Sequence, residues 1–484
     1  MDELELMYRG TLKSCNYSCY YCPFSKNTVS LSEIEKDKFQ LKVFFENLNK
    51  KYLKKIFITP YGEGLIHKYY RDEIEKAIKR KDIKSIGIQT NLSLNIIEWI
   101  KNMKEKKLSI DKINLWITCH FSQIDYDTFI FKIKNIYKDI NISVGVVGIP
   151  KDYEDILSLR KDLPKSVYLW INEYSHLKEE YSKELIEKFK NIDPIFYRRK
   201  EIDFSEYCSC GVGSFFIEGN GKVRLCNRNP KILGTFMKEN YFSKKHCNKK
   251  DCDCYLTYSK FKSNIFNFFG DKKLYRVPEK INIKNIFFDI DGTLVENREI
   301  SQEKIETIKF LYEKNYNLYF ITDLPKDIAL KKCSKVSKYF KGGIFDCGAH
   351  ISMENLEIYE TMEINMEMFR ENILKSYSFD NRLYKVLLKR NNLKIEGTDI
   401  FKGIPNILVK KGINKFSALK KVGSILNMNL DEVLAIGNDL NDITLFTNLK
   451  YSVCVLNGKT KAKEKSKYQL NINQILYILR GEKI

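Results

Sequence analysis

The chain of 484 residues is predicted to fold as an α/β protein built in two successive parts. In the first part, short runs of β-branched and aromatic residues alternate with helical patterns, which favours a parallel sheet, here a partial (β/α)6 barrel. The second part begins with another apolar strand at Ile286. Between the two parts lies a stretch with six cysteines, residues 208–254, which predicts a small cysteine-rich extension.

Strands of the first part are expected at residues 56–59, 83–89, 113–118, 143–149 and 167–171. The first helix is expected to follow Ser32 as its N-cap, with Glu35 completing a capping box, and to run to Leu48. Loops at the carboxyl ends of parallel strands form the site in such folds. Residues 89–93, 118–121 and 172–174 should therefore face the cofactor and the substrate. His120 in the second loop could be a proton donor or a satisfied loop histidine.

Three cysteines lie on one short segment of the first part: Cys15, Cys19 and Cys22. Three thiolates on one loop can hold three irons of a [4Fe-4S] cluster and leave the fourth iron open for reaction. A zinc site is the alternative, but zinc usually requires a fourth ligand close by, and none is adjacent in the sequence.

This Cys-x-x-x-Cys-x-x-Cys spacing, with aromatic Tyr21 before the third cysteine, resembles the radical S-adenosylmethionine (SAM) superfamily. Together with residues 8–12, 61–63, 89–93 and 170–172, the cysteine segment 14–24 looks like one largely uncharacterised bacterial family within it. The resemblance implies a TIM-like partial barrel in which the amino and carboxylate groups of SAM complete the cluster. It implies reductive cleavage of SAM, hydrogen abstraction by a 5′-deoxyadenosyl radical, and an electron donor of the flavodoxin or ferredoxin type. The SAM-binding residues that it implies are Tyr21, Gly62, Glu63 and Asn91.

In the cysteine-rich stretch, residues 208–226 read as two short strands joined at Gly219–Gly221, a strong hairpin signal that would bring Cys208 or Cys210 near Cys226. The stretch resembles the SPASM or twitch extension of many radical SAM enzymes, which implies an auxiliary [4Fe-4S] cluster. Zinc remains the competing interpretation. The expected ligands are Cys208, Cys226, Cys247 and either Cys252 or Cys254.

Residues 260–284 read as a linker with some local helix. The strand that follows ends in an Asp-x-Asp-Gly-Thr turn, and alternation of side chains along an extended segment lets Asp289 and Asp291 point toward the same site. Two carboxylates at a strand end can hold Mg²⁺ and divide nucleophilic and acid/base work.

This turn resembles motif one of the haloacid dehalogenase (HAD) superfamily, and three further segments match its other motifs in order: residues 318–322, 414–419 and 433–442. The resemblance implies a Rossmannoid domain that hydrolyses phosphate esters. It makes Asp289 the nucleophile that becomes aspartyl-phosphate and Asp291 the general acid/base. It implies that Thr322 hydrogen-bonds to the phosphoryl group and that Lys415 neutralises the charge of that group. The implied Mg²⁺ ligands are Asp289, Asp291, Asn438, Asp439 and Asp442.

The interval between Thr322 and Lys415 can hold an inserted α+β cap, about residues 324–405, as in the Cof-like (class II cap) subgroup. Two departures from that subgroup stand out. Asp323 and Leu324 replace the Gly-Arg that commonly follows motif two, and Asn438 stands where an aspartate is usual. Asn438 can still offer a carbonyl oxygen to Mg²⁺, but the missing charge argues against high turnover.

These signals divide the chain into a barrel at residues 1–205, a cysteine-rich extension at 206–258, a linker at 259–282 and a HAD-like domain at 283–484. Ten of the 13 cysteines precede Tyr255, which favours metal over disulfides in a cytoplasmic protein. We expect no membrane segment, because no run of about 18 apolar residues and no signal segment occurs. The net charge of +21 comes from lysines scattered over the chain rather than from a basic arm, which disfavours nucleic-acid binding.

Together these observations predict a bifunctional enzyme that acts on a small-molecule or peptide-derived substrate. Two alternatives stay open: a HAD half that only binds or senses a phosphorylated ligand, and a radical SAM enzyme that modifies RNA.

Overall fold

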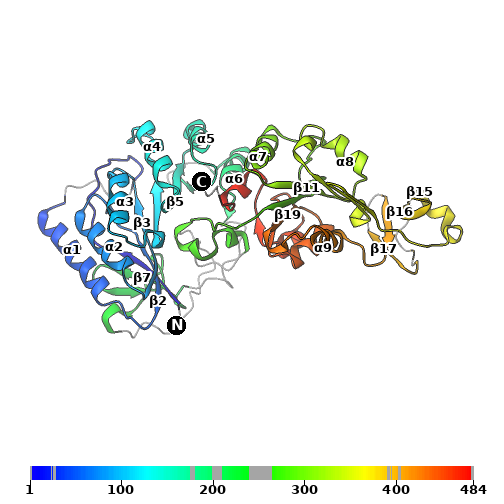
Figure 1. Ribbon diagram of the computed structural model, residues 1–484. Coiled ribbons are helices and arrows are strands. Elements are labelled where there is room, and N and C mark those ends of the chain that lie inside the picture. Colours follow the sequence, from blue (N-terminus) through cyan, green and yellow to red (C-terminus); the bar gives the residue numbers. More distant parts are fainter. Residues whose placement is uncertain are drawn as a thin grey trace. The chain divides into compact units, whose positions relative to one another are not determined.

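The computed structural model describes residues 3–22, 24, 29–174, 180–198, 210–238, 264–389, 393, 395–401 and 405–480 (Figure 1). The chain forms two compact units, Met1–Glu279 (unit 1) and Lys280–Ile484 (unit 2). Both are mixed α/β structures with largely parallel sheets, as the sequence predicts.

Unit 1 is built on a sheet whose strand order, among the described residues, is β6-β5-β4-β3-β2-β1-β7-β8-β9. Strands β1 to β6 are parallel to their neighbours. They are β1 (Glu3–Arg9), β2 (Leu53–Ile58), β3 (Ile83–Thr90), β4 (Ile113–Thr118), β5 (Asn141–Gly148) and β6 (Tyr168–Glu173). The sequence analysis missed β1, although its alternating buried residues Leu4, Leu6 and Tyr8 carry the strand signal.

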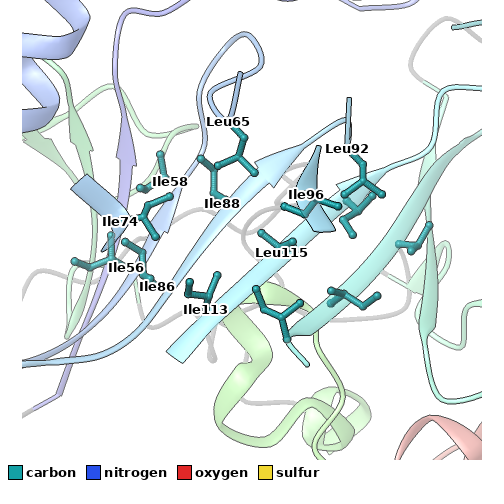
Figure 2. Packing of buried hydrophobic residues seen from close by; sticks show 14 of the residues in the cluster. Ile56, Ile58, Leu65, Ile74, Ile86, Ile88, Leu92, Ile96, Ile113 and Leu115 are labelled. Atoms are coloured by element: carbon teal, nitrogen blue, oxygen red, sulfur yellow. The ribbon is translucent and has the colours of Figure 1, made fainter. Parts of the chain in front are cut away.

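One helix follows each strand of this parallel series. They are α1 (Leu31–Glu46), α2 (Lys68–Ile78), α3 (Ile96–Glu105), α4 (Tyr126–Ile136), α5 (Tyr153–Asp162) and α6 (Lys183–Ile192). Their apolar sides cover one face of the sheet, where strands β2 to β4 pack against α2 and α3 (Figure 2). The side chains at this contact include Ile56, Ile58, Ile74, Ile86, Ile88, Ile96, Ile113 and Leu115.

Helix α1 begins two residues earlier than the sequence analysis predicted. Ser30, not Ser32, is the N-cap, because its side chain accepts a hydrogen bond from Glu33 N and the Glu33 carboxylate accepts one from Ser30 N at 2.8 Å. Both Ser30 with Glu33 and Ser32 with Glu35 fit the Ser-x-x-Glu pattern. The pattern alone therefore cannot choose between the two registers.

The opposite face of the sheet is covered by residues that the sequence analysis assigned to a linker. The segment η6 (Asn264–Tyr275) packs its aromatic side chains into unit 1. The Tyr275 hydroxyl lies 2.9 Å from Ser85 Oγ, and the Arg276 guanidinium lies 4.6 Å from the ring centre of Trp116 and 5.2 Å from that of Trp170. Residues 264–279 thus differ from a linker, since burying these aromatic rings outweighs the cost of ordering the segment.

The predicted hairpin at Gly219–Gly221 is confirmed. It joins β7 (Ser214–Glu218) to the antiparallel β8 (Lys222–Arg224), and β9 (Ile232–Thr235) extends the sheet. Gly221 has a φ of +83°, a conformation that favours glycine. Because β7 pairs in parallel with β1, the hairpin continues the sheet of unit 1.

Unit 2 has a main sheet of order β14-β13-β12-β11-β10-β19-β20-β21. Its strands are β10 (Asn285–Phe288), β11 (Asn317–Ile321), β12 (Gly342–Phe345), β13 (His350–Met353), β14 (Leu356–Tyr359), β19 (Val433–Gly437), β20 (Tyr451–Cys454) and β21 (Tyr468–Gln469). All neighbours are parallel except at β13 and β14. The helices are α7 (Gln302–Glu313), α8 (Lys326–Lys332), α9 (Lys415–Ile425), α10 (Ile443–Asn448) and α11 (Thr460–Lys465).

A separate four-stranded sheet, of order β15-β16-β18-β17, forms the inserted part of unit 2. It consists of β15 (Ile373–Phe379), β16 (Arg382–Leu388), β17 (Thr398–Phe401) and β18 (Asn406–Lys410). The inserted part begins later in the sequence than the expected cap of residues 324–405. The reason is that residues 342–359 bury alternate side chains in the main core and join the main sheet as β12 to β14. Lys385 of β16 pairs with buried Asp346 at 2.5 Å and ties the second sheet to the main one.

No helix in the described ranges is long and apolar enough to cross a membrane.

Candidate active sites of the two units

The cysteine loop of unit 1 follows β1 and holds its three thiols close together. Cys22 N donates to the carbonyl oxygen of Cys19 at 3.1 Å, which closes a turn between these two cysteines. Burial, followed by the charges of the neighbouring Cys22 and Cys15, raises the pKa of the Cys19 thiol to about 11. Tyr17 N and Asn91 Nδ2 approach Cys15 Sγ at 3.5 and 3.8 Å. Soft thiolate donors with N–H groups directed at a sulfur are the chemistry that suits an iron–sulfur cluster.

A second loop, after β2, holds the cysteine loop in place. Gly62 N donates to the carbonyl oxygen of Leu12 at 3.0 Å, and Glu63 N donates to that of Ser14 at 2.9 Å. A Cβ atom at Gly62 would lie only 1.8 Å from the carbonyl oxygen of Ser14. Only glycine allows this approach of the two backbones.

Glu63 is buried and joins the same loop to the end of β3. Its carboxylate accepts hydrogen bonds from Thr90 Oγ1 at 2.9 Å, Leu65 N at 3.1 Å and Asn91 N at 2.5 Å. Burial raises the pKa of Glu63 to about 7, while these donors lower it. In this arrangement Glu63 positions the loop, and its expected contact with SAM stays a prediction.

Tyr21 and Asn91, two other expected SAM-binding residues, lie against the same loops. Asn91 Nδ2 donates to Asn16 Oδ1 at 3.0 Å, within the cysteine segment. The Tyr21 hydroxyl lies 2.8 Å from His120 Nδ1 after β4, and burial lowers the pKa of His120 to about 4. His120 is therefore a buried histidine paired with Tyr21, and a role as proton donor stays a prediction.

Sequence reasoning missed Asp37, which supports the start of the cysteine loop. Its fully buried carboxylate accepts hydrogen bonds from Leu12 N, Tyr69 OH and Tyr70 OH, each at 2.9 Å. The only signal in the sequence is an aspartate inside helix α1 among residues that pack into the core.

In the cysteine-rich stretch, Cys226 and Cys210 are buried in one cluster with Leu225. The other expected ligands, Cys208, Cys247, Cys252 and Cys254, lie outside the described residues. Within the described ranges, no three or more His, Cys, Asp or Glu side chains form a ready-made metal site.

In unit 2, three predicted residues follow neighbouring parallel strands. Asp289 follows β10, Thr322 follows β11 and Asn438 follows β19. The carboxyl ends of parallel strands meet at one edge of a sheet, so these residues share that edge. Thr322 Oγ1 accepts a hydrogen bond from Leu324 N at 3.2 Å, which turns the chain after β11.

Lys415, the first residue of α9, connects two of the predicted carboxylates. Its buried Nζ donates to Asp289 Oδ1 at 2.8 Å and to Asp442 Oδ1 at 2.7 Å. Burial raises the pKa of Asp289 to about 8, Lys415 lowers it, and the charges of Asp442 and Asp323 raise it. Asp442 Oδ2 accepts from Asn438 N and Asp439 N, so both oxygens of Asp442 are used within the protein.

The other oxygen of Asp289 and the amide oxygen of Asn438 both contact the hydroxyl of Thr293. Thr293 Oγ1 lies 3.3 Å from Asp289 Oδ2 and 3.2 Å from Asn438 Oδ1. A Cβ atom at Gly292, whose φ is +77°, would lie 2.1 Å from Asn438 Nδ2, so glycine is required at this turn. Two oxygen donors beside one hydroxyl fit a hard cation such as Mg²⁺.

Two predicted residues are engaged elsewhere. Asp291 is half exposed and pairs with Lys332 at 2.7 Å, whereas Asp289 is buried. Alternation of side chains after β10 therefore does not by itself describe how these two carboxylates are placed. Both carboxylates nevertheless lie near Cys333, since burial and then their charges raise the pKa of that thiol to about 12. Asp439 pairs with Lys459 at 2.6 Å. Their expected roles as metal ligands stay predictions.

Comparison with protein families assigns the two units separately. Residues 11–163 match the radical SAM superfamily, and residues 286–383 and 352–475 match the haloacid dehalogenase-like hydrolases. With the sites described above, these matches define the chain as an enzyme. It is a fusion of a radical SAM domain with a haloacid dehalogenase-like hydrolase domain.

Curated relatives include phosphatases of archaea. A phosphoglycolate phosphatase of Nitrosopumilus maritimus is 25% identical over 199 residues, which cover 37% of this chain and 85% of that protein. A phosphoserine phosphatase of Methanocaldococcus jannaschii is 28% identical over 221 residues, which cover 41% of this chain and 96% of that protein.

Comparison with solved structures finds a haloacid dehalogenase-like hydrolase from Bacteroides thetaiotaomicron. The match has 19% identity and a TM-score of 0.33, and it covers 39% of this chain and 93% of that one. A protein from Thermoplasma acidophilum has 18% identity, a TM-score of 0.34, and coverage of 40% of this chain and 95% of that one.

Proposed function

We propose that the chain is a bifunctional enzyme in which unit 1 performs radical SAM chemistry and unit 2 hydrolyses a phosphate ester with the aid of Mg²⁺. The phosphatase half rests above all on the buried contact of Lys415 with Asp289 and Asp442 at the carboxyl edge of the main sheet.

In this proposal Asp289 attacks the phosphorus atom and the ester P–O bond breaks. Asp291 protonates the leaving oxygen and then activates the water that releases phosphate from Asp289. Lys415 neutralises charge on the phosphoryl oxygens, and Asp442 holds Lys415 in place. A magnesium ion held by Asp289 and Asn438 would stabilise the same charge and lower the pKa of Asp289 below its metal-free value of about 8.

A phosphatase assay on a panel of phosphate monoesters tests this half. Phosphate release should require Mg²⁺, stop on adding EDTA, and fall by at least about 10³-fold in Asp289→Asn, because the nucleophile is lost. The control is Asp431→Asn, which neutralises an exposed carboxylate of the same unit and should leave the rate unchanged. Equal rates in wild type and Asp289→Asn would exclude the proposed mechanism.

The names of the curated relatives suggest a substrate class. Phosphoglycolate and phosphoserine are small phosphate monoesters that carry a carboxylate. We propose a small substrate of this kind, or a peptide-derived equivalent, for unit 2.

A second candidate is that unit 2 only binds or senses a phosphorylated ligand. Asn438 favours this reading, because it offers no charge to a metal where an aspartate is usual, and a weaker metal site lowers turnover. Mg²⁺-independent ligand binding with no turnover on any ester would support it.

For unit 1 we propose a partial (β/α)6 barrel whose Cys15, Cys19 and Cys22 hold a [4Fe-4S] cluster. The reduced cluster, when bound, supplies the electron for cleavage of SAM, and a flavodoxin- or ferredoxin-type protein would reduce it. The contact of Gly62 with Ser14 sets the shape of the loop. Asn91, which is bonded to Asn16 of the cysteine segment, and Tyr21 would orient SAM in this proposal.

Anaerobically reconstituted protein should release 5′-deoxyadenosine from SAM, and replacing the three cysteines by Ala should abolish this. Cys454→Ala, which replaces a buried cysteine of unit 2, is the control. Continued 5′-deoxyadenosine release by the triple variant would refute the ligand assignment.

We further propose that the cysteine-rich extension holds an auxiliary [4Fe-4S] cluster on Cys208, Cys226, Cys247 and Cys252 or Cys254. The burial of Cys226 with Cys210 beside the hairpin supports a clustered set of thiols. The triple variant should then keep about four irons per chain after reconstitution. One zinc and no iron in that sample would instead indicate a structural zinc knuckle.

A further inference from the structure

We propose that Asp323 acts as a built-in competitor of the phosphoryl group: its carboxylate occupies hydrogen-bonding and charged groups that an incoming phosphate would use. This inference rests on the proposed phosphatase site and concerns which ligands that site accepts.

Asp323 directly follows Thr322 at the end of β11, so its side chain stands beside the proposed phosphoryl-binding edge of the sheet. Its Oδ2 accepts a hydrogen bond from Asn441 Nδ2. Its Oδ1 lies 3.9 Å from Lys415 Nζ. Asp323 therefore connects two donors that come from segments about a hundred residues away in the chain.

Both donors are ones that a phosphoryl oxygen would need. Lys415 is buried beside Asp289, the proposed nucleophile, so its ammonium group faces the position of the reacting phosphorus. Asn441 lies three residues after Asn438, and its Oδ1 is buried without a hydrogen-bond partner among the described residues. The contact with Asp323 thus takes up the donor side of this amide.

Charge strengthens the competition. Lys415 already contacts the carboxylates of Asp289 and Asp442, and Asp323 is a third carboxylate within 4 Å of the same ammonium. A phosphoryl dianion has to enter against these charges, and their effect is large at a partly buried site. The charge of Asp323 also contributes, after burial and Asp442, to the raised pKa of Asp289.

Asp323 can release Lys415 and Asn441, because its side chain is partly exposed. Its side chain is 30% exposed, whereas those of Lys415 and Asp442 are 1% and 0% exposed. Asp323 can therefore turn toward solvent when a ligand binds, while Lys415 stays in place. The expected consequence is weak affinity for simple phosphate esters in the native protein.

Binding of inorganic phosphate to the full chain, measured by isothermal titration calorimetry with and without Mg²⁺, tests the proposal. Asp323→Asn, which removes the charge and keeps the shape, and Asp323→Gly, which removes the group, should each tighten phosphate binding at least tenfold. The matched control is Asp327→Asn, which removes the same charge from an exposed position four residues along the chain and should leave the affinity unchanged.

Steady-state kinetics with p-nitrophenyl phosphate gives an independent readout. In both Asp323 variants KM should fall at least tenfold, with a smaller change in kcat, because a competitor acts mainly on binding. Unchanged or weaker phosphate binding in both variants would overturn the proposal, and so would a loss of activity that shows Asp323 to be required.

These outcomes separate this inference from the proposed function. If no variant hydrolyses any ester but Asp323→Asn still tightens phosphate binding, the phosphatase proposal fails and the role of Asp323 stands. If Asp289→Asn abolishes turnover but the Asp323 variants bind phosphate as the native protein does, only the role of Asp323 fails.

Discussion

In both units, contacts with a distant segment of the chain determine which residue type is found at several site positions. Gly62 matters because the Ser14 carbonyl oxygen occupies the space of its absent side chain, and Gly292 matters because Asn438 does the same. Lys415 is buried only because Asp289 and Asp442 compensate its charge. In each case the residue type follows from a contact between segments that are distant in the sequence.

Gly62→Ala tests this dependence in unit 1. The new Cβ would meet the Ser14 backbone at 1.8 Å, so the cysteine loop must move, at a cost of about 1–3 kcal/mol. We expect reconstituted Gly62→Ala to bind less iron and to release less 5′-deoxyadenosine than the native protein. Gly64→Ala is the milder neighbour, since its Cβ would meet side-chain atoms at 3.2 Å or more. Equal iron content in native protein and Gly62→Ala would contradict the geometry of the two loops.

His120 provides a pH-dependent prediction. Burial lowers its pKa to about 4, whereas an unfolded chain protonates histidine below about pH 6.5. Between these values the unfolded state binds more protons, so the contribution of His120 to stability is lost as the pH falls from about 6.5 to 4. In iron-free protein labelled with ¹³C-histidine, one of the five histidine signals should titrate near pH 4 and be absent in His120→Asn. A His120 signal that titrates near its ordinary value would show that the ring is solvated.

At the scale of secondary-structure elements, neighbouring parallel strands bring the site residues together. The loops after β1, β2 and β3 carry the cysteines, Gly62 with Glu63, and Asn91. The ends of β10, β11 and β19 carry Asp289, Thr322 and Asn438. Helices then complete the arrangement, because α9 begins with Lys415, and Asp37 inside α1 accepts a hydrogen bond from Leu12 N.

The start of α1 can be checked directly, because two serines compete for the N-cap. Replacing an N-cap serine by alanine costs about 1 kcal/mol, so Ser30→Ala should fray the first turn and Ser32→Ala should have a smaller effect. Hydrogen exchange measured by mass spectrometry on peptides that span residues 31–35 should be faster in Ser30→Ala. Faster exchange in Ser32→Ala than in Ser30→Ala would restore the register that the sequence alone suggested.

At the scale of the whole molecule, the chain consists of two units, and the first ends later than its cysteine pattern suggests. Residues 264–279 close one face of the sheet of unit 1 with Phe268, Phe269, Tyr275 and Arg276, all of which are buried. The radical SAM unit thus includes the segment that immediately precedes the hydrolase unit.

Shortened chains test this boundary. A chain that ends at Glu279 should fold and unfold cooperatively. One that ends just before Asn264 should aggregate, because it loses Arg276 over Trp116 and Trp170 and the buried aromatic rings of η6. Each buried aromatic side chain lost is worth about 3–5 kcal/mol. Soluble yield and near-ultraviolet circular dichroism of the two chains provide the comparison. Identical spectra and yields would show that the segment is a linker after all.

The sequence by itself determined the local features of this protein. The spacing of Cys15, Cys19 and Cys22, the hairpin at Gly219–Gly221 and the strands β2 to β6 of unit 1 could be predicted because periodicity, turn residues and motif spacing act over about ten residues. The order of four hydrolase motifs likewise identified Asp289, Thr322, Lys415 and the segment that ends at Asp442 before their contacts were visible.

Only the tertiary structure decided which of these residues touch. Three contacts join segments that lie far apart in the chain. They are the packing of Gly62 on Ser14, the hydrogen bond from Leu12 N to Asp37, and the contact of Asp323 with Asn441. Such contacts depend on strand order, loop path and the burial of charge, and no short window of sequence contains that information. For the same reason the sequence read residues 264–279 as a linker, since the sheet face that buries their aromatic rings is formed by strands more than a hundred residues earlier.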